Sequence, residues 1–257
     1  MLHLTRNPIY KIIAYWQWKK TKSLEKEYWK YFDKVFFISD LDYEIATSES
    51  IDLKHKFIVL YDGYELVTEE VVIPENSDFI LPTNFKAIQN RMNFKHFIEN
   101  IWKPNMSRLK DMNIKLFITG ASEREISKII RPFSLESLNI VSLGFVDNID
   151  EVILKFKYVL SPTYIGSGIR LKLLNGMACG KPVFVTPLDT STCKVFKDMS
   201  SVILFSNAKE FMEKLLLLEK DTNLYMNVCR EAIRTISNFF NWEYYYKKAI
   251  KIMLEED

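Results

Sequence analysis

The sequence predicts an α/β fold, a Rossmann-like doubly wound parallel sheet, preceded by a partial N-terminal α/β unit. From residue 77 onward, short apolar runs typical of buried parallel strands alternate with segments of helical periodicity. In addition, six of the seven glycines lie between positions 120 and 180, where they can serve turns and close backbone approaches. Successive strand–helix steps favour a parallel sheet with helices packed on its faces.

The regular part begins with a short strand over 79–81. A helix is expected over 93–109, and Pro104 should kink or interrupt it because proline has no backbone N–H. Asn148 or Asp150 could cap a later helix. The remaining predicted elements outside the central motif are a strand over 114–119, a helix over 123–130, strands over 139–145 and 202–205, and helices over 208–218, 221–235 and 242–254.

The central motif is the stretch from Ser161 to Pro187, SPTYIGSGIRLKLLNGMACGKPVFVTP. An apolar run over 158–161 ends in a loop that contains Gly166 and Gly168. A helix is then expected over 169–178, ended by a glycine and a proline, and a buried strand over 183–186 follows. The stretch therefore reads as a βαβ unit with its glycine loop at the carboxyl end of the first strand.

That loop predicts an anion site. Ligands of open α/β sheets bind at the carboxyl edge, and free amides at a helix N-terminus favour negative charge. Arg170 and Lys172 add positive charge near the helix start, which points to a phosphate or diphosphate. The local pattern also fits a tight turn followed by two solvated basic residues, and it matches neither of the common phosphate-loop motifs.

The order of residues in the central motif carries information beyond its local structure. The string GSGIRLKLLNGMACGKPVFVT, from Gly166 to Thr186, closely resembles the donor-binding segment of GT-B glycosyltransferases of family 4, the glycosyl transferases group 1. The resemblance implies a retaining transfer of a sugar, as by a hexosyltransferase, from a nucleotide-sugar donor. We expect neither a metal nor another cofactor. The resemblance also implies that Gly166, Ser167, Gly168 and Ile169 bind the donor. Arg170 and Lys172 would then be catalytic, offsetting charge on the departing diphosphate.

The chain departs from the family at the positions of two glutamates, which are Ser167 and Asn175 here. In the family the second glutamate binds the nucleotide ribose. An amide at Asn175 can hydrogen-bond a hydroxyl but lacks the charge of a carboxylate, so weaker donor binding and lost catalysis both stay open.

Other donor contacts follow from the same resemblance. Gly144 and Phe145 resemble the loop that contacts the base. Arg91 lies near the place where the family holds the diphosphate, although it could equally be a surface charge. The segment 188–192 is polar and lacks the glycine that family members often carry there, so a donor role for it is doubtful.

Composition limits the other function classes. The 257 residues carry a net charge of +2, which gives no reason to expect nucleic acid as a partner. Three unpatterned cysteines suit a reducing cytoplasm, and the three histidines are too scattered for a metal site. No apolar run reaches the about 20 residues that a membrane span needs. We expect a cytoplasmic protein, with peripheral membrane contact as an open alternative.

The N-terminal part predicts a second unit. We expect residues 1–73 to be a remnant of a GT-B N-terminal domain and residues 74–257 to form the nucleotide-sugar-binding domain. Strands are expected over 33–39 and 57–61, with Asp40 capping the helix between them. Because the family binds its acceptor with earlier strands, a separate N-terminal half would complete the enzyme. The other possible partner is a second copy of this chain, in a homo-oligomer. The alternative is a non-catalytic partner subunit or a decayed homologue.

Residues 8–32 mix Trp, Tyr and Lys and read as one or two helices. Such a mixture suits a helix that lies in a lipid headgroup layer. The other interpretation is an amphipathic helix that packs its apolar residues against a sheet and keeps its lysines in water. The residues that would pack are Ile9, Ile12, Ile13, Trp16 and Tyr28.

Overall fold

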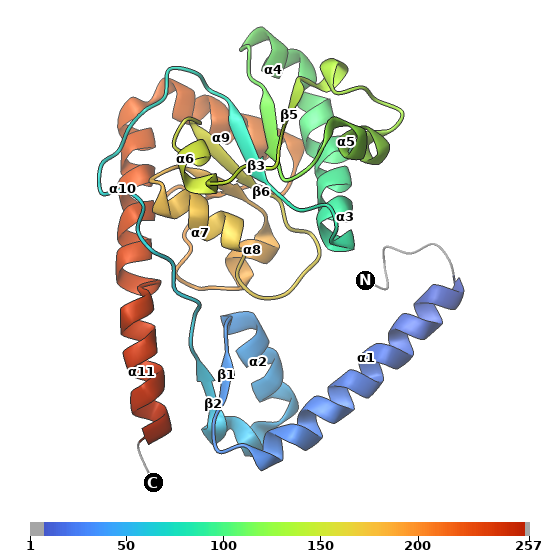
Figure 1. Ribbon diagram of the computed structural model, residues 1–257, viewed down its shortest axis with the longest axis vertical. Helices are drawn as coiled ribbons and strands as arrows, with labels where there is room; N and C mark the ends of the chain where they lie inside the picture. The colour runs from blue at the N-terminus through green and yellow to red at the C-terminus, as the bar shows by residue number, and fades with distance from the viewer. Residues whose placement is uncertain (1–7, 255–257) are drawn as a thin grey trace.

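The computed structural model describes residues 8–254, which contain two parallel sheets (Figure 1). The small sheet pairs β1 (Val35–Phe37) with β2 (Phe57–Val59). The six strands of the large sheet are β3 (Phe79–Pro82), β4 (Leu116–Thr119), β5 (Ile140–Gly144), β6 (Tyr158–Ser161), β7 (Val183–Val185) and β8 (Ile203–Leu204). The predicted fold class is confirmed. Residues 1–7 and 255–257, the outermost parts of the two predicted units, lie outside the described residues, and the boundary near residue 73 stays a prediction.

The helices lie before, between and after these strands (Figure 1). They are α1 (Pro8–Tyr28), α2 (Asp40–Glu49), α3 (Ile88–Phe97), α4 (Met106–Asp111), α5 (Glu123–Ile130), α6 (Ile149–Ile153), α7 (Leu171–Ala178), α8 (Pro187–Ser191), α9 (Ala208–Lys220), α10 (Thr222–Phe239) and α11 (Trp242–Leu254). The strand–helix alternation predicted from residue 77 onward is therefore present, and Asn148 caps α6 by accepting from the backbone N–H groups of Asp150 and Glu151.

The topology of the large sheet creates a ligand crevice. The strand order is β5-β4-β3-β6-β7-β8, and all neighbouring pairs are parallel. β3 comes first in the sequence but lies inside the sheet, with β4 and β5 added on one side and β6, β7 and β8 on the other. The connections that leave β3 and β6 therefore diverge, and in open α/β sheets such a switch point is where ligands bind.

The core forms because the central strands are apolar on both faces. Successive side chains of β3 alternate, so that Phe79 joins one buried cluster and Ile80 joins the other. Phe79 stacks on Tyr158 with ring centroids 4.9 Å apart and meets Phe184 edge-on at 5.1 Å. This aromatic cluster fixes β3, β6 and β7 relative to one another, and it thereby fixes the loops that follow them.

Two helix boundaries before the central motif differ from prediction. Ser39, not Asp40, caps α2, because Ser39 is extended and its hydroxyl accepts from the Asp42 N–H at 3.1 Å. The helix predicted from residue 93 begins at Ile88, and its first residues are at least partly exposed and thus lack the apolar spacing that marks a helix in sequence. The interruption at Pro104 is confirmed, since a π-helical turn over 98–102 and a 3-10 turn over 103–105 separate α3 from α4.

Two further differences concern the central motif. The helix predicted from residue 169 begins at Leu171, because Gly168 is left-handed (φ +70°) and Arg170 is extended (ψ 122°). The segment predicted as a polar loop after Pro187 forms α8. Thr186 and Asp189 make a capping box there, with proline in the first turn.

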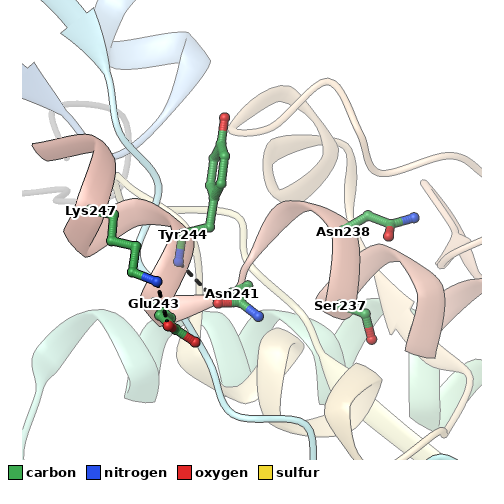
Figure 2. Close-up of a pocket in the computed structure, with 6 residues that line it drawn as sticks. All are labelled: Ser237, Asn238, Asn241, Glu243, Tyr244 and Lys247. Atoms are coloured by element: carbon green, nitrogen blue, oxygen red, sulfur yellow. Dashed lines mark hydrogen bonds and ion pairs between the residues drawn. The ribbon is translucent and has the colours of Figure 1, made fainter. Parts of the chain in front are cut away.

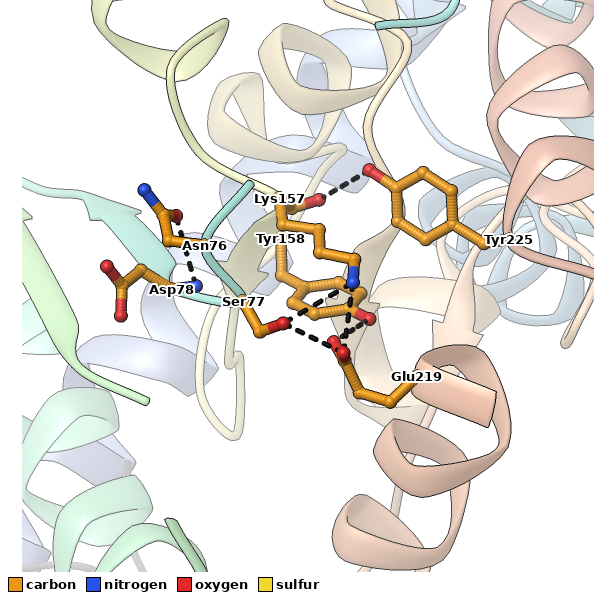
Figure 3. Close-up of polar contacts among 7 residues, drawn as sticks. All are labelled: Asn76, Ser77, Asp78, Lys157, Tyr158, Glu219 and Tyr225. Carbon is orange, nitrogen blue, oxygen red and sulfur yellow. Dashed lines mark hydrogen bonds and ion pairs between the residues drawn. The ribbon is translucent and has the colours of Figure 1, made fainter. Parts of the chain in front are cut away.

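A polar cluster closes the opposite, amino-terminal edge of the large sheet (Figure 3). Glu219 of α9 accepts hydrogen bonds from Tyr158 at 2.6 Å and Ser77 at 2.8 Å, and it pairs with Lys157 at 3.0 Å. The Tyr225 hydroxyl donates to the Lys157 carbonyl at 3.1 Å. These bonds join α9 and α10 to the starts of β3 and β6, so the cluster stabilises the fold at the edge away from the crevice.

The small sheet is joined to the large one by a few specific contacts. The backbone N–H of Asp40 donates to the Thr192 carbonyl at 2.9 Å, and the Asp40 carboxylate accepts from the Tyr61 hydroxyl at 2.8 Å. The Tyr61 ring lies edge-on to Tyr245 of α11 at 6.0 Å. Figure 1 shows α11 running from the large sheet alongside the small one. The segment after β1 thereby lies next to the central motif.

Candidate functional site

The glycine loop after β6 is held in place by one buried side chain. The Asn93 side-chain oxygen accepts from the backbone N–H groups of Tyr164 at 2.9 Å and Ile165 at 3.0 Å. Its amide nitrogen donates to the Ile165 carbonyl at 3.0 Å. Asn93 lies on α3, which follows β3, so these three bonds join the two connections that diverge at the switch point.

A cavity of about 580 Å³ lies between these two connections. One wall comes from the residues after β3 and the other from the glycine loop after β6. The lining residues are Ala87, Gln89, Asn90, Ile165, Gly166, Ser167 and Arg170. The structure thus places Gly166, Ser167 and Arg170, all predicted site residues, around one hollow at the carboxyl edge of the sheet.

Hydrogen-bond donors in this loop are left without acceptors. Within the described residues, the backbone N–H groups of Gly166, Ser167 and Gly168 make no hydrogen bond. The Arg170 guanidinium lies directly against Gly166, where a Cβ atom would be 2.0 Å from Nη2. Gly166 also has φ +149°, so a side chain there would be strained as well as crowded.

Arg170 itself is under-satisfied. Its Nε and Nη2 atoms are buried, and they have no hydrogen-bond partner among residues 8–254. Burial lowers the pKa of the guanidinium, while the carboxylates of Asp189 and Asp42 oppose that change. A buried cation with unused donors is costly unless an anion or acceptor reaches it. The arrangement therefore favours an anionic ligand that accepts hydrogen bonds from the loop.

Asp189, like Asn93, is a residue of this site that the sequence interpretation missed. Its side chain is almost fully buried in α8, and Oδ2 accepts from the Thr186 N–H at 3.1 Å and hydroxyl at 3.0 Å. Oδ1 is buried and has no partner in the described part of the chain. Burial raises the pKa of this carboxyl to about 6, against the opposing effects of the Thr186 bonds and the Lys172 charge. The sequence signal that could have identified Asp189 is the Thr-Pro-x-Asp capping pattern after β7.

Lys172 lies in the first turn of α7, near the charges of Arg170 and Asp189. Burial of its ammonium group lowers the pKa of Lys172 to about 8; Asp189 counteracts this effect and Arg170 reinforces it. Lys172 does not line the cavity described above. The buried carboxylate of Asp189 thus acts electrostatically on both predicted catalytic cations, Arg170 and Lys172.

The segment after β1 covers part of the loop. A Cβ atom on Gly168 would lie 3.2 Å from Cδ1 of Ile38, so the small sheet reaches the central motif directly. Ile169, at the end of the loop, is buried in one of the two core clusters that include strands of the large sheet.

The remaining predicted donor contacts lie around this centre. Arg91 donates from Nη1 to the carbonyls of Phe85 and, at 3.2 Å, of Lys86, which fastens the loop after β3. Gly144 ends β5 with φ +65° and accepts from the Gly120 N–H at 2.6 Å, and the Phe145 side chain is largely exposed. None of Arg91, Gly144 and Phe145 lines the 580 Å³ cavity.

Asn175 is engaged elsewhere in the protein. Its amide nitrogen donates to the Tyr64 hydroxyl and to the Asp150 carboxylate at 3.1 Å. Tyr64 also donates to Asp150 at 3.1 Å. Asn175 is nearly fully buried, and it ties α7 to α6 and to the segment that follows β2.

A second cavity, of about 440 Å³, lies at the junction of α10 and α11 (Figure 2). Its charged side chains pair with one another, since Lys247 contacts Glu243 at 2.6 Å. Asn241 caps α11 by accepting from the Tyr244 N–H at 3.1 Å. Lys247, Glu243 and the Asn241 side chain are thus already engaged within the protein, unlike the donors of the glycine loop.

Residues 8–254 contain neither a candidate metal site nor a candidate membrane span. Their His, Cys, Asp and Glu side chains do not gather in threes or more in a way that could hold a metal ion. None of their helices combines the length and apolar character needed to cross a membrane.

Solved structures share the fold of this protein. TarM of S. aureus, crystallised with UDP, superposes with a TM-score of 0.70 at 15% identity, over 92% of this chain and 47% of TarM. Anabaena HepE, in complex with UDP-glucose, gives a TM-score of 0.65 at 10% identity, over 86% of this chain and 63% of HepE. At these identities the likeness concerns the fold alone, and that fold is GT-B-like, as the resemblance implied.

The sequence comparisons give the family. A family model described as glycosyl transferases group 1 matches residues 80–221, more than half of the chain. An uncharacterized glycosyltransferase of Methanocaldococcus jannaschii is 23% identical over 229 residues, covering 82% of this chain and 56% of that protein. The chain belongs to the glycosyl transferases group 1 family, and it spans about half the length of the relatives it matches.

Proposed function

We propose that this protein binds a nucleotide-sugar donor through the glycine loop after β6 and acts in retaining sugar transfer. The observation that carries the proposal is the pairing of unused donors with a cavity. Gly166 and Ser167, whose backbone N–H groups have no acceptor, and Arg170, whose buried Nε and Nη2 have no partner in the described residues, line a hollow at the switch point of the sheet. A diphosphate supplies the negative charge and acceptor oxygens that these groups lack.

The cations have a role in the chemical step. As the bond between the sugar and the diphosphate breaks, negative charge builds on the leaving phosphate. Arg170 lies against the loop, and Lys172 stands in the first turn of α7. Positive groups that are already in place can stabilise that charge without rearrangement in the transition state. Gly166 and Ser167 contribute backbone N–H groups to the same anion.

Uridine diphosphate is the first probe, because TarM and HepE were crystallised with UDP or a UDP-sugar. Ligand at roughly 100 times its Kd stabilises a folded protein by about 2.7 kcal/mol, which raises Tm by about 5–10 °C in a chain of this size. We expect UDP to raise Tm and Arg170→Gln to abolish most of that rise. Arg124→Gln, at an exposed position of α5, is the matched control.

The proposal is wrong if UDP, GDP and ADP all leave Tm unchanged. It is also wrong if a folded Arg170→Gln protein responds to the nucleotide like the Arg124→Gln control. Lys172→Gln provides a second test of the cationic site should Arg170→Gln fail to fold.

One observation favours a second candidate, a non-catalytic partner subunit that keeps the fold. In the family the position of Asn175 binds the ribose, whereas the amide here is held by Tyr64 and Asp150. Turnover of a UDP-sugar, followed as UDP release by the chain alone or mixed with an acceptor-binding half, would exclude this candidate. UDP binding without turnover in both settings would favour it.

A further inference from the structure

Helix α1 projects away from the rest of the protein. Figure 1 shows it leaving the small sheet and running clear of the large one. Its 21 residues form one continuous helix, about 30 Å long at 1.5 Å per residue. Toward its C-terminal end the helix contacts the elements that follow, because Lys22 pairs with Glu49 and Lys26 donates to the Glu49 carbonyl at 2.9 Å.

The exposed residues of α1 include an apolar stripe. Ile9, Ile12, Ile13 and Trp16 follow the i, i+3, i+4, i+7 spacing that places side chains on one side of a helix. Their exposed fractions are 65%, 58%, 46% and 64%, and Tyr28 is 58% exposed. The interpretation in which these residues pack against a sheet of this chain is therefore wrong. Contiguous apolar surface of this kind marks an interaction site.

The positive charge of α1 favours one class of partner. From Pro8 to Ser23 the sequence contains four lysines (Lys11, Lys19, Lys20 and Lys22) and no acidic residue. The Lys22 ammonium lies 5.0 Å from the centre of the Trp18 ring, so basic and aromatic side chains are interleaved. A second copy of α1 would bring Lys11, Lys19 and Lys20 together without carboxylates from this part of the helix to offset them, whereas Lys22 already pairs with Glu49. An anionic lipid surface offers both an apolar layer and negative charge.

We propose that α1 lies in the headgroup layer of an anionic membrane and docks this protein there. The stripe of Ile9, Ile12, Ile13 and Trp16 enters the boundary between headgroups and acyl chains, and Lys11, Lys19 and Lys20 meet lipid phosphates. The helix lies in the plane of the membrane rather than across it, since its lysines interrupt any apolar span. This proposal rests on the N-terminal helix and is independent of the donor site.

The test is sedimentation of the full chain with phosphatidylcholine vesicles, with or without phosphatidylglycerol. We expect binding to the anionic vesicles that weakens with added salt, because exposed charges are screened. Ile12→Glu/Trp16→Glu should reduce partitioning by more than about tenfold, because it places two charges in an apolar layer. The matched control is Leu217→Glu/Phe239→Glu, at exposed apolar positions of α9 and α10.

The contribution of the lysines to membrane binding has its own test. Each lysine near an anionic surface contributes about a factor of five to binding, so Lys19→Glu/Lys20→Glu should lose roughly 25-fold or more. Lys110→Glu/Lys128→Glu changes the net charge equally at exposed positions of α4 and α5 and should lose far less.

Three results would overturn the proposal. The first is failure of the unmodified chain to bind anionic vesicles. The second is binding that the α1 variants and their controls lose equally. The third is self-association without vesicle binding. If light scattering shows an oligomer that Ile12→Glu/Trp16→Glu converts to a monomer, the partner of α1 is a second copy of this chain.

Discussion

Replacing Asp189 by asparagine should make the protein more stable at neutral pH and flatten its dependence on pH. Burial raises the pKa of this carboxyl from an ordinary 3.8 to about 6. The variant keeps one side-chain oxygen to accept from the Thr186 N–H and hydroxyl. It removes a buried negative charge whose other oxygen, Oδ1, has no partner in the described residues.

The sign and the size of this change in stability follow from the linkage between proton binding and folding. A carboxyl whose pKa is higher in the folded state favours folding while it is protonated, below its unfolded pKa, and this contribution disappears as pH rises through the folded value. The difference between 3.8 and about 6 corresponds to about 3 kcal/mol at neutral pH. Lys172 loses its counter-charge in the variant, so we expect a net gain of about 2 kcal/mol near pH 7 and almost none near pH 4.

Urea unfolding followed by tryptophan fluorescence, from about pH 4 to about pH 7.5, measures this difference directly. Asp147→Asn, at an exposed position, is the control and should leave the profile parallel to that of the unmodified protein. Profiles of Asp189→Asn and the unmodified protein that run parallel across this range would refute the reasoning, because they would mean that Asp189 titrates alike in the folded and unfolded chain.

Two further predictions concern the loop and the opposite edge of the sheet. Asn93→Ala removes three hydrogen bonds to the glycine loop, so we expect a loss of about 2–4 kcal/mol in the free energy of unfolding and a weaker UDP-induced rise in Tm. A normal UDP response in the folded variant would argue against its positioning role. Glu219→Ala leaves the half-buried Lys157 without its counter-charge and should cost about 2–3 kcal/mol without affecting UDP binding. Glu213→Ala, which breaks an exposed pair on the same helix, should cost under about 0.5 kcal/mol in urea unfolding, and equal losses for the two variants would contradict this account.

The sequence by itself determined the large sheet and the position of its loop. Apolar strands such as β3 and β6 are buried on both faces, so their signal is local and needs no knowledge of neighbours. The glycine loop was visible for the same reason, because Gly166 and Gly168 stand between a strand and a helix whatever surrounds them. The family resemblance from Gly166 to Thr186 added the class of protein.

Tertiary structure decided which side chains meet. Asn93 and Tyr164 are 71 positions apart in sequence, and no periodicity shows that one would hold the loop of the other. The charge environment of Asp189 also depends on packing, since its high pKa arises from burial beside residues of another connection. The exposure of α1 is of the same kind: a pattern shows which residues share a helix face, but only the arrangement of the other elements shows whether that face is covered.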